Sequence, residues 1–251
     1  MRIVSLAPSV TETLFALGLG SEIVANTAYC DYPDEAKKIP KAGGFSTSRL
    51  EKILEFKPDV VITCTVVQNQ AKELFSKSNL RHIHLDPRSL MDIYKDILLL
   101  GKELKVNTKG INIVNSMKEK AKKLRSSQLR VKPRVYIEEW FDPPMGSGNW
   151  VPDIVELAGG VYNLIPKGEI SQEILLSKLQ KFNPEIIFVA YCGYMDKSDT
   201  RKILDRAGWS DIDAVKNRRV FAIDDRLLNR PGPRVLEAAE VMQKFLAFNF
   251  G

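Results

Sequence analysis

Aromatic and arginine side chains dominate the segments that the sequence pattern places in loops. These segments follow predicted strands and comprise Tyr29 to Pro33, Glu139 to Met145, Asn149 with Trp150, Tyr191 to Tyr194 and Asn229 to Arg234. Aromatic rings supply stacking surfaces, and a guanidinium group offers a planar fork of hydrogen-bond donors. These side chains suit the binding of a flat organic ligand that carries amides or anionic groups.

Catalytic groups do not assemble into a recognisable pattern in the same loops. The sequence contains no glycine-rich phosphate loop, no G-x-S-x-G element and no H-E-x-x-H pair. His82 and His84 alternate on a predicted strand and share one face, but they lack a third ligand, so we interpret them as structural. The residues therefore favour binding over catalysis, and we expect neither a metal site nor a resident cofactor.

Composition describes a folded globular chain. The 251 residues are 44% hydrophobic and 27% charged, and the three cysteines form no C-x-x-C pair, so neither a disulfide framework nor a zinc site is supported. The formal net charge is +6, but the lysines between Lys118 and Lys123 lie among helix-forming residues. We interpret them as a solvated helix face rather than a nucleic-acid-binding surface.

The first residues predict a strand rather than a targeting segment. From Met1 the chain enters the apolar run Ile3 to Leu6 without a basic region and cleavage site ahead of it. No stretch of about 18 apolar residues follows, so no membrane-spanning helix is predicted. Taken by itself, this sequence predicts a soluble, monomeric protein without an export signal, which leaves a cytoplasmic location open.

Strands and helices alternate in two series. Strands are predicted over 2–6, 23–26, 60–63 and 81–85, with helices between them, and a second series begins near Arg134. Such alternation favours a parallel sheet covered on both faces, and hence the α/β class. Between the series, apolar residues keep helical spacing from Ser89 to about Arg125, which predicts one long helix. We therefore predict an N-terminal lobe (1–88), a connecting backbone helix (89–132) and a C-terminal lobe (133–251).

The second series repeats the first. Leu50 to Ile62 aligns with Leu176 to Phe188 at an offset of 126 residues, with identical Leu, Lys, Phe and Pro at four positions. Helix–proline–strand units resemble one another in many proteins, so this alignment alone admits a chance origin. The shared order of strand, helix, glycine, helix, proline and strand favours two related lobes.

Six stretches carry a resemblance to a known family. They are Ser5 to Glu12, Tyr29 to Pro33, Gly43 to Phe45 ahead of Leu50 to Ile53, Gly146 to Pro152, Glu156 to Gly160, and Asn229 to Arg234. In this order they resemble the substrate-binding proteins of cobalamin and iron-siderophore ABC importers, most closely the cobalamin-binding branch. The resemblance implies two Rossmann-like lobes joined by one long backbone helix, a ligand cleft between the lobes, and no catalysis.

The resemblance also implies ligand-binding residues. Tyr29 looks like the tyrosine that packs on the corrin, and Phe45 occupies the place of an aromatic residue on the first lobe's side of the cleft. Arg230 resembles the arginine that reaches the ligand from the second lobe. Met145 stands where the family can have an aromatic residue, so the stacking surface is expected from Trp140 or Trp150. Each aromatic side chain also has a structural interpretation, as half-buried loop packing.

A permease partner is the next implication of the resemblance. In the family, one exposed glutamate on each lobe pairs with arginines of an ABC permease dimer, and Glu51 stands at the first-lobe position. Its repeat partner is Ser177. Glu173, four residues or one helical turn earlier, is the candidate to substitute for the second docking glutamate, although it is out of register with Glu51 by those four residues.

Three alternatives remain open at this stage. The chain could be a cytosolic corrinoid-binding protein, or a binder of haem or a ferric siderophore with the same fold. It could also be an enzyme that acts on a corrinoid through Cys192 or the histidine pair, although no catalytic motif supports that interpretation.

Overall fold

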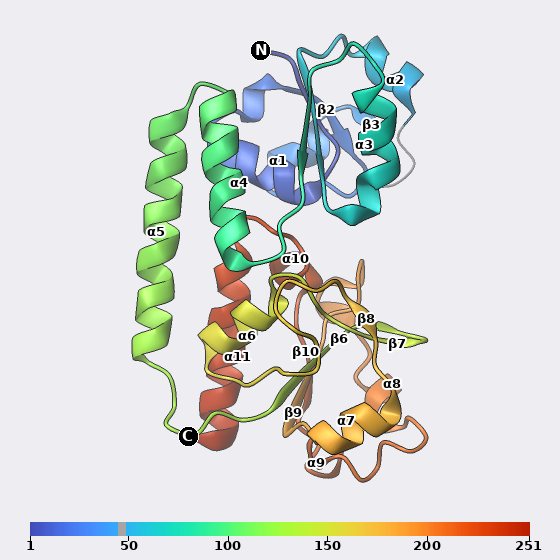
Figure 1. Cartoon of the computed structure of the whole chain (residues 1–251), viewed down its shortest axis with the longest axis vertical. Helices are drawn as coiled ribbons and strands as arrows, with labels where there is room; N and C mark the ends of the chain where they lie inside the picture. The colour runs from blue at the N-terminus through green and yellow to red at the C-terminus, as the bar shows by residue number, and fades with distance from the viewer. Residues whose placement is uncertain (45–48) are drawn as a thin grey trace. The chain divides into compact units, whose positions relative to one another are not determined.

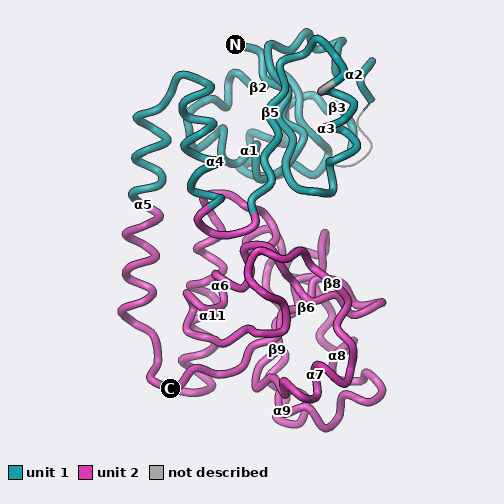
Figure 2. Tube along the Cα trace, in the orientation of Figure 1, with its two compact units in different colours: residues 1–87, 92–115 teal, residues 88–91, 116–251 magenta. Residues whose placement is uncertain are grey.

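The structure is a computed structural model that describes residues 1–44 and 49–251. The chain divides into two compact units: residues 1–87 with 92–115, and residues 88–91 with 116–251 (Figure 2). Each unit is built on a five-stranded sheet with helices packed against it (Figure 1). The α/β class and the two-lobed organisation predicted from the sequence are therefore confirmed.

The first unit has a parallel sheet in the order β3-β2-β1-β4-β5. Its strands are β1 (Ile3–Ser5), β2 (Ile23–Thr27), β3 (Lys41–Gly43), β4 (Val60–Cys64) and β5 (His82–Leu85). Helices α1 (Pro8–Ala16), α2 (Leu50–Glu55) and α3 (Asn69–Ser76) lie wholly in this unit.

Alternate residues of the first sheet enter two separate cores. Ile3 of β1 packs with Leu14 of α1 in one fully buried cluster. The next residue, Val4, faces a second cluster that contains Ile53 of α2 and Phe75 of α3. Both faces of the sheet are thus covered, as short apolar parallel strands require. Truncating a buried leucine such as Leu14 to alanine would cost about 2–5 kcal/mol.

The second unit has a mixed sheet in the order β10-β9-β6-β7-β8. Its strands are β6 (Val135–Phe141), β7 (Pro144–Gly146), β8 (Gln172–Glu173), β9 (Ile186–Val189) and β10 (Val220–Ala222). Strands β6, β9 and β10 run parallel, whereas β7 and β8 are antiparallel to their neighbours.

Helices of the second unit are short except for the last. They are α6 (Val151–Ala158), α7 (Leu176–Phe182), α8 (Arg201–Leu204), α9 (Asp213–Lys216), α10 (Asp225–Leu228) and α11 (Val235–Phe250). Helix α11 packs along α6. Within the described residues, no helix combines the length and the apolar character that crossing a membrane would need.

The internal repeat is present in the structure. Helices α2 and α7 both begin at the first residue of the aligned segments, and β4 and β9 follow at the same offset of 126 residues. Strand β1 pairs with β4 as β6 pairs with β9: Ile3 lies opposite Val60, and Val135 lies opposite Ile186.

An arginine ahead of the central strand makes the same contacts in both units. Arg2 N donates to Asp59 Oδ2 at 2.7 Å, and Arg134 N donates to Glu185 Oε2 at 3.0 Å. The Arg2 Nε also donates to the Lys57 carbonyl, and the Arg134 Nε donates to the Asn183 carbonyl. Lys57 and Asn183 have positive φ angles of 45° and 47°, so the chain leaves both helices in the same left-handed turn.

The single long helix predicted over 89–132 is wrong. The segment forms two helices, α4 (Leu90–Glu103) and α5 (Asn107–Ser126), separated by a turn in which Lys105 has a φ of 61°. Gly101 and Gly110, which interrupt the apolar pattern, are the residues where the two helices approach. A Cβ atom added at Gly101 would lie 3.3 Å from the Gly110 Cα. The close approach of two backbones, rather than a long strut, explains these glycines.

Candidate ligand-binding surfaces

A row of aromatic rings lies at the carboxyl ends of β6 and β9 in the second unit. Trp140 stacks on Phe141 with ring centroids 5.4 Å apart, and Phe141 packs edge-on against Tyr191 at 5.6 Å. Tyr191 in turn lies 6.0 Å from Tyr194. The two ends of the row, Trp140 and Tyr194, are 39% and 41% exposed. Lys202 Nζ lies 3.3 Å from the Phe141 centroid and adds a positive charge to the row.

A buried ionic network holds this row in place. Glu138 of β6 is fully buried and accepts from Arg206 Nη1 at 2.7 Å and from Arg206 Nη2 at 2.9 Å. Tyr191 Oη and Tyr136 Oη donate to the same carboxylate. Burial raises the pKa of Glu138, and the Arg206 guanidinium opposes that rise. Burial also raises the pKa of Tyr191, so its hydroxyl stays protonated and fixes the ring as a donor.

The antiparallel part of the sheet brings three predicted site residues together. Met145 of β7 lies opposite Trp140 of β6 on one side and opposite Glu173 of β8 on the other. Directly paired residues of neighbouring strands project from the same face of a sheet. Trp140, Met145 and Glu173 therefore share one surface, with Glu173 exposed.

The prediction that Glu173 lies one helical turn before Ser177 is therefore wrong. Helix α7 begins only at Leu176, and Glu173 is the last residue of strand β8. Gln172 and Glu173 form a strand because they pair with Gly146 and Met145 of β7. A strand of two residues is too short to show an alternating pattern in the sequence. Ser177, by contrast, is the second residue of α7, as Glu51 is the second residue of α2, and Glu51 is exposed.

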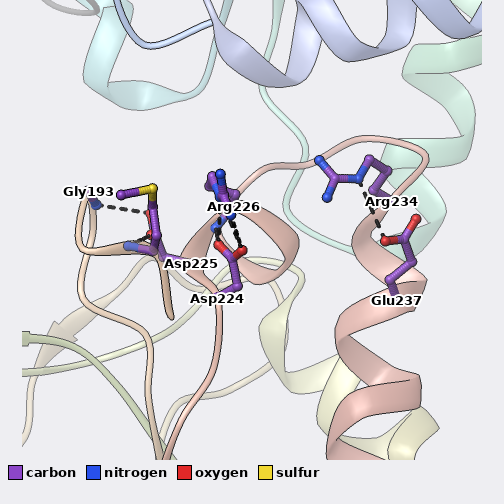
Figure 3. A network of polar contacts seen from close by, with 7 residues as sticks. Gly193, Asp224, Asp225, Arg226, Arg234 and Glu237 are labelled. Atoms are coloured by element: carbon purple, nitrogen blue, oxygen red, sulfur yellow. Dashed lines mark hydrogen bonds and ion pairs between the residues drawn. The ribbon is translucent and has the colours of Figure 1, made fainter. Parts of the chain in front are cut away.

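Asp225 fixes the turn that carries Tyr194. Its carboxylate accepts from the backbone N of Gly193 at 3.0 Å and from that of Met195 at 2.6 Å (Figure 3). Gly193 and Met195 have positive φ angles of 86° and 56°, so the turn departs from regular structure and depends on this acceptor. Asp225 is 7% exposed, and burial raises its pKa while the two backbone donors oppose the rise.

Three arginines follow at intervals of four residues. Arg226 forms a two-pronged pair with Asp224, with Nη2 2.6 Å from Oδ2, and Arg234 Nε lies 3.6 Å from Glu237 Oε2 (Figure 3). Arg230 lies between them and is half-buried; its positive charge opposes the burial-driven rise in the pKa of Asp225 and adds to the lowering of the Asp224 pKa by Arg226. The region thus concentrates guanidinium groups next to the turn that presents Tyr194.

Trp150 is a core residue. Its side chain is 4% exposed, and its Nε1 donates to the Leu228 carbonyl at 2.8 Å, which ties the start of α6 to the end of α10. The predicted role of Trp150 as a stacking surface is not carried forward, because its ring has no exposed face. Trp140 retains one.

Exposed aromatic residues of the first unit lie after β2. Tyr29 is 59% exposed and Tyr32 is 45% exposed. Val67, after β4, adds an exposed apolar side chain at 58%. Phe45, the other predicted aromatic residue of this unit, lies outside the described residues.

Neutral hydrogen bonds hold the loops of the first unit. Cys30 lies between the two tyrosines in the sequence. Its sulfur is 3.1 Å from Thr11 Oγ1 and 3.2 Å from Thr27 Oγ1. Gln68 donates to the Leu6 carbonyl at 2.7 Å and accepts from Cys64 N at 2.8 Å, which links the loops after β1 and β4. These side chains are buried, so the loops rest on a preformed, uncharged base.

The residues considered for catalysis have structural partners. Thr63 Oγ1 lies 2.8 Å from both His82 Nε2 and His84 Nδ1. Burial of the sulfur raises the pKa of Cys192 to about 12, so this thiol is protonated at neutral pH and is a poor nucleophile. In the described part of the chain, no three side chains are grouped to hold a metal ion.

A family model described as "Periplasmic binding protein" matches residues 3–227. The chain belongs to the periplasmic binding protein family. Members of this family are substrate-binding transport proteins and not enzymes, which removes the enzymatic alternative. The match includes residues of both units, from β1 to the third residue of α10.

Curated relatives cover nearly the whole chain. The vitamin B12-binding protein of Vibrio cholerae is 29% identical over 254 residues, which span 98% of this chain and 88% of that protein. The Bacillus subtilis ABC transporter substrate-binding lipoprotein YvrC, itself uncharacterised, is also 29% identical and covers 95% of this chain and 77% of its own length.

Solved structures share the fold. An ABC transporter substrate-binding protein from Listeria monocytogenes superposes with a TM-score of 0.87 at 24% identity and covers 99% of both chains. The vitamin B12 binding protein BtuF of Vibrio cholerae gives a TM-score of 0.76 at 25% identity, over 98% of this chain and 96% of that one. The haem complex of Staphylococcus aureus IsdE gives 0.85 at 20% identity, over 97% and 98%.

Sequence reasoning missed several residues of these surfaces. Of the three arginines, it selected only Arg230, although the spacing of Arg226 and Arg234 around it is visible in the sequence. The loop that ends in Tyr194 was recognised without a role for that ring, and Lys202 was missed; both join the aromatic row through tertiary contacts. For Lys202, no local pattern distinguishes this position from other surface lysines.

Proposed function

We propose that this protein is the ligand-binding component of an ABC importer and that its ligand is a corrinoid. The observation that carries the proposal is the row of rings from Trp140 to Tyr194, held by the buried Glu138–Arg206 network and flanked by guanidinium groups. A row fixed before binding offers stacking area at little entropic cost. Identity of 29% with a vitamin B12-binding protein over 98% of the chain supports a corrinoid.

The chemistry of a corrinoid fits both loop surfaces. Its ring is flat and its periphery carries amides, so exposed rings such as Tyr29 and Trp140 would stack on it and guanidinium groups would donate to amide oxygens. Its cobalt brings its own ligands within the molecule, so the protein need not supply a metal-coordinating side chain.

A second candidate ligand is an anionic iron chelate, a haem or a ferric siderophore. The positive charge gathered at Arg226, Arg230 and Arg234 favours it, because guanidinium groups attract carboxylates. A haem would also require an axial ligand. Both histidines contact Thr63, whereas Tyr29 and Tyr32 are exposed, which makes the two tyrosines candidates for that ligand.

Calorimetry separates the candidates. The protein is titrated in turn with cyanocobalamin, cobinamide, haemin and a ferric siderophore. The proposal expects a dissociation constant of about 1 μM or less for a corrinoid, a one-to-one complex and unchanged ligand after release. Tight binding of haemin or a siderophore without corrinoid binding would replace the corrinoid by an anionic chelate.

Delivery to a permease is the remaining part of the proposal. Glu51 is exposed in the first turn of α2, where a carboxylate can reach a partner's arginine. Co-purification with a reconstituted corrinoid permease tests it. If the protein bound its ligand tightly but formed no complex with the permease, it would be a corrinoid-binding protein that does not act with an importer.

A further inference from the structure

The positive charge of the chain is concentrated in one segment. Residues 102–132 contain ten basic and two acidic residues, a net charge of +8, whereas the whole chain carries +6. The remainder of the chain is therefore slightly acidic. Most of these basic side chains are exposed; Lys120, which pairs with Glu240, is half-buried. A fold that only needed solubility would spread such charges over its surface.

Helix α5 places the end of this segment beside the C-terminus. Lys120 Nζ lies 2.9 Å from Glu240 Oε2, and three to four residues later Gln243 Nε2 donates to the Leu124 carbonyl at 2.9 Å. Since both residue numbers rise together, α5 and α11 run in the same direction within the second unit. Their last turns therefore lie at the same end, where Figure 1 shows the C-terminus next to the chain that leaves α5.

This end lies at the edge of the sheet remote from the aromatic row. The chain passes from α5 into Val135, the first residue of β6. The Arg219 guanidinium, one residue before β10, lies 4.6 Å from the ring centroid of Phe250 in α11. Both contacts fall at the amino ends of parallel strands, whereas Trp140 lies at the carboxyl end of β6 and Tyr191 follows that of β9. A partner at this end would leave the ligand-binding loops of the unit uncovered.

Apolar side chains are exposed among the charges. Phe248, in the last turn of α11, is 88% exposed, although Leu246 of the same turn is 1% exposed. Val131 is 61% exposed between Arg130 and Lys132. We call this surface the basic end; its residues are Lys122, Arg125, Arg130, Val131, Lys132 and Phe248.

We propose that the basic end of the second unit binds the surface of an anionic lipid bilayer. Lysine and arginine clusters are attracted to anionic headgroups, and an exposed phenylalanine gains by entering the boundary between headgroups and acyl chains. Nucleic acid would satisfy the charges, but its backbone offers Phe248 no apolar environment. The combination of basic residues with Phe248 and Val131 therefore favours a bilayer.

Vesicle flotation tests the proposal. The full chain is mixed with phosphatidylcholine vesicles and with vesicles that contain about one third phosphatidylglycerol. We expect binding only to the anionic vesicles, with loss at high salt. The combined change Lys122→Glu, Arg125→Glu and Lys132→Glu should weaken binding at least tenfold. Its matched control is Lys38→Glu with Lys52→Glu and Lys178→Glu, three exposed lysines elsewhere, which alters net charge equally.

Phe248→Ser supplies a second variant that does not change charge. Because Phe248 is almost fully exposed, the fold should be unaffected, and binding to anionic vesicles should fall severalfold. Equal loss in the control triple variant would show that net charge alone acts, and would overturn the proposal. The proposal would also be overturned if the unaltered chain did not bind vesicles. Binding of duplex DNA instead of vesicles, lost in the Lys122, Arg125 and Lys132 triple variant, would show that the surface binds nucleic acid.

Discussion

The two units are alike at the amino ends of their strands and differ at the carboxyl ends, where the loops of the candidate site begin. At the amino ends of the strands, Arg2 with Asp59 and Arg134 with Glu185 make equivalent hydrogen bonds. At the carboxyl ends, the first unit anchors its loops through Thr11, Cys30 and other uncharged groups, whereas the second uses the buried pair Glu138–Arg206. The contacts at the amino ends stabilise the repeated fold, whereas the residues at the carboxyl ends differ between the two units.

The sheets differ in the same way. In the first unit β1 has parallel neighbours on both sides, whereas in the second β6 has parallel β9 on one side and antiparallel β7 on the other. The antiparallel hairpin places Trp140 and Met145 opposite each other, whereas all paired strands in the described part of the first unit are parallel. The second unit should therefore depend more on charge, and the first more on neutral packing.

Arg206→Ala should give the largest effect on stability. Removing one partner of a buried ion pair leaves the Glu138 carboxylate uncompensated, at a cost of about 3–5 kcal/mol. Thr11→Val in the first unit removes two neutral hydrogen bonds, one with the Ser5 hydroxyl and one to the Cys30 sulfur, and should cost about 1–2 kcal/mol. Urea denaturation of both variants checks the comparison, and equal losses would contradict an ionic anchor in the second unit.

Arg2→Ala and Arg134→Ala should behave alike. The side chain of each arginine donates from Nε to a carbonyl group at the end of a helix, so each loss should cost about 1–2 kcal/mol, while the backbone bonds to Asp59 and Glu185 remain. Thermal unfolding of the two variants measures these contacts at the amino ends of the strands. A difference well beyond that range would show that the equivalence of the two units is geometric only.

Asp96 offers the contrasting case of a buried carboxyl group with an unpartnered oxygen. Among the described residues its Oδ2 has no hydrogen-bond partner, and burial raises its pKa to about 7. Since the unfolded value is about 3.9, the folded chain binds more protons between about pH 4 and pH 7. The free energy of unfolding should therefore fall as pH rises through this window.

Asp96→Asn should remove that pH dependence. Stability at pH 8 should rise by on the order of 1 kcal/mol, with little change at pH 4, where the native carboxyl is already protonated. Urea unfolding at the two pH values measures the effect. Glu138→Gln is the comparison in the second unit, and we expect it to destabilise, because Glu138 has a cation to neutralise it. A destabilised Asp96→Asn at pH 8 would contradict the assignment.

Glu51→Ala should give the smallest effect. An exposed ion pair contributes about 0.2–1 kcal/mol, so binding to a corrinoid permease should weaken by up to about fivefold while ligand affinity stays unchanged. Ser177→Glu, at the equivalent position of α7, should strengthen the permease complex by a similar factor. Surface-bound permease and soluble variants give both affinities. If neither variant changed the affinity for the permease, α2 and α7 would not be part of the docking surface.

The scaffold was predictable because its signals are local. The aligned segments from Leu50 and Leu176 mark a helix, a proline and a buried strand, and these patterns depend on neighbours in sequence. The turn at Lys105 was not predictable, because the apolar spacing continues through it and only the approach of Gly101 to Gly110 shows that two helices meet.

The candidate site was predictable only in part, for the same reason. Loop position and residue type indicated Tyr29, Trp140 and Arg230. They could not show that Trp150 turns into the core to donate to the Leu228 carbonyl, or that Glu173 pairs as a strand. Those outcomes depend on contacts between residues far apart in the sequence.

The most direct test of the account is the affinity of the protein for cyanocobalamin, measured by calorimetry with the unaltered chain and with Tyr29→Ala, Trp140→Ala and the double variant. Tyr29 is 59% exposed, whereas Trp140 is 39% exposed and packs on Phe141, so circular dichroism of each variant checks that it is folded. If loops of both units bind the corrinoid, each substitution should weaken binding about fivefold to tenfold, and the double variant by the product. Unchanged affinity in the double variant, or no binding by the unaltered chain, would contradict the account.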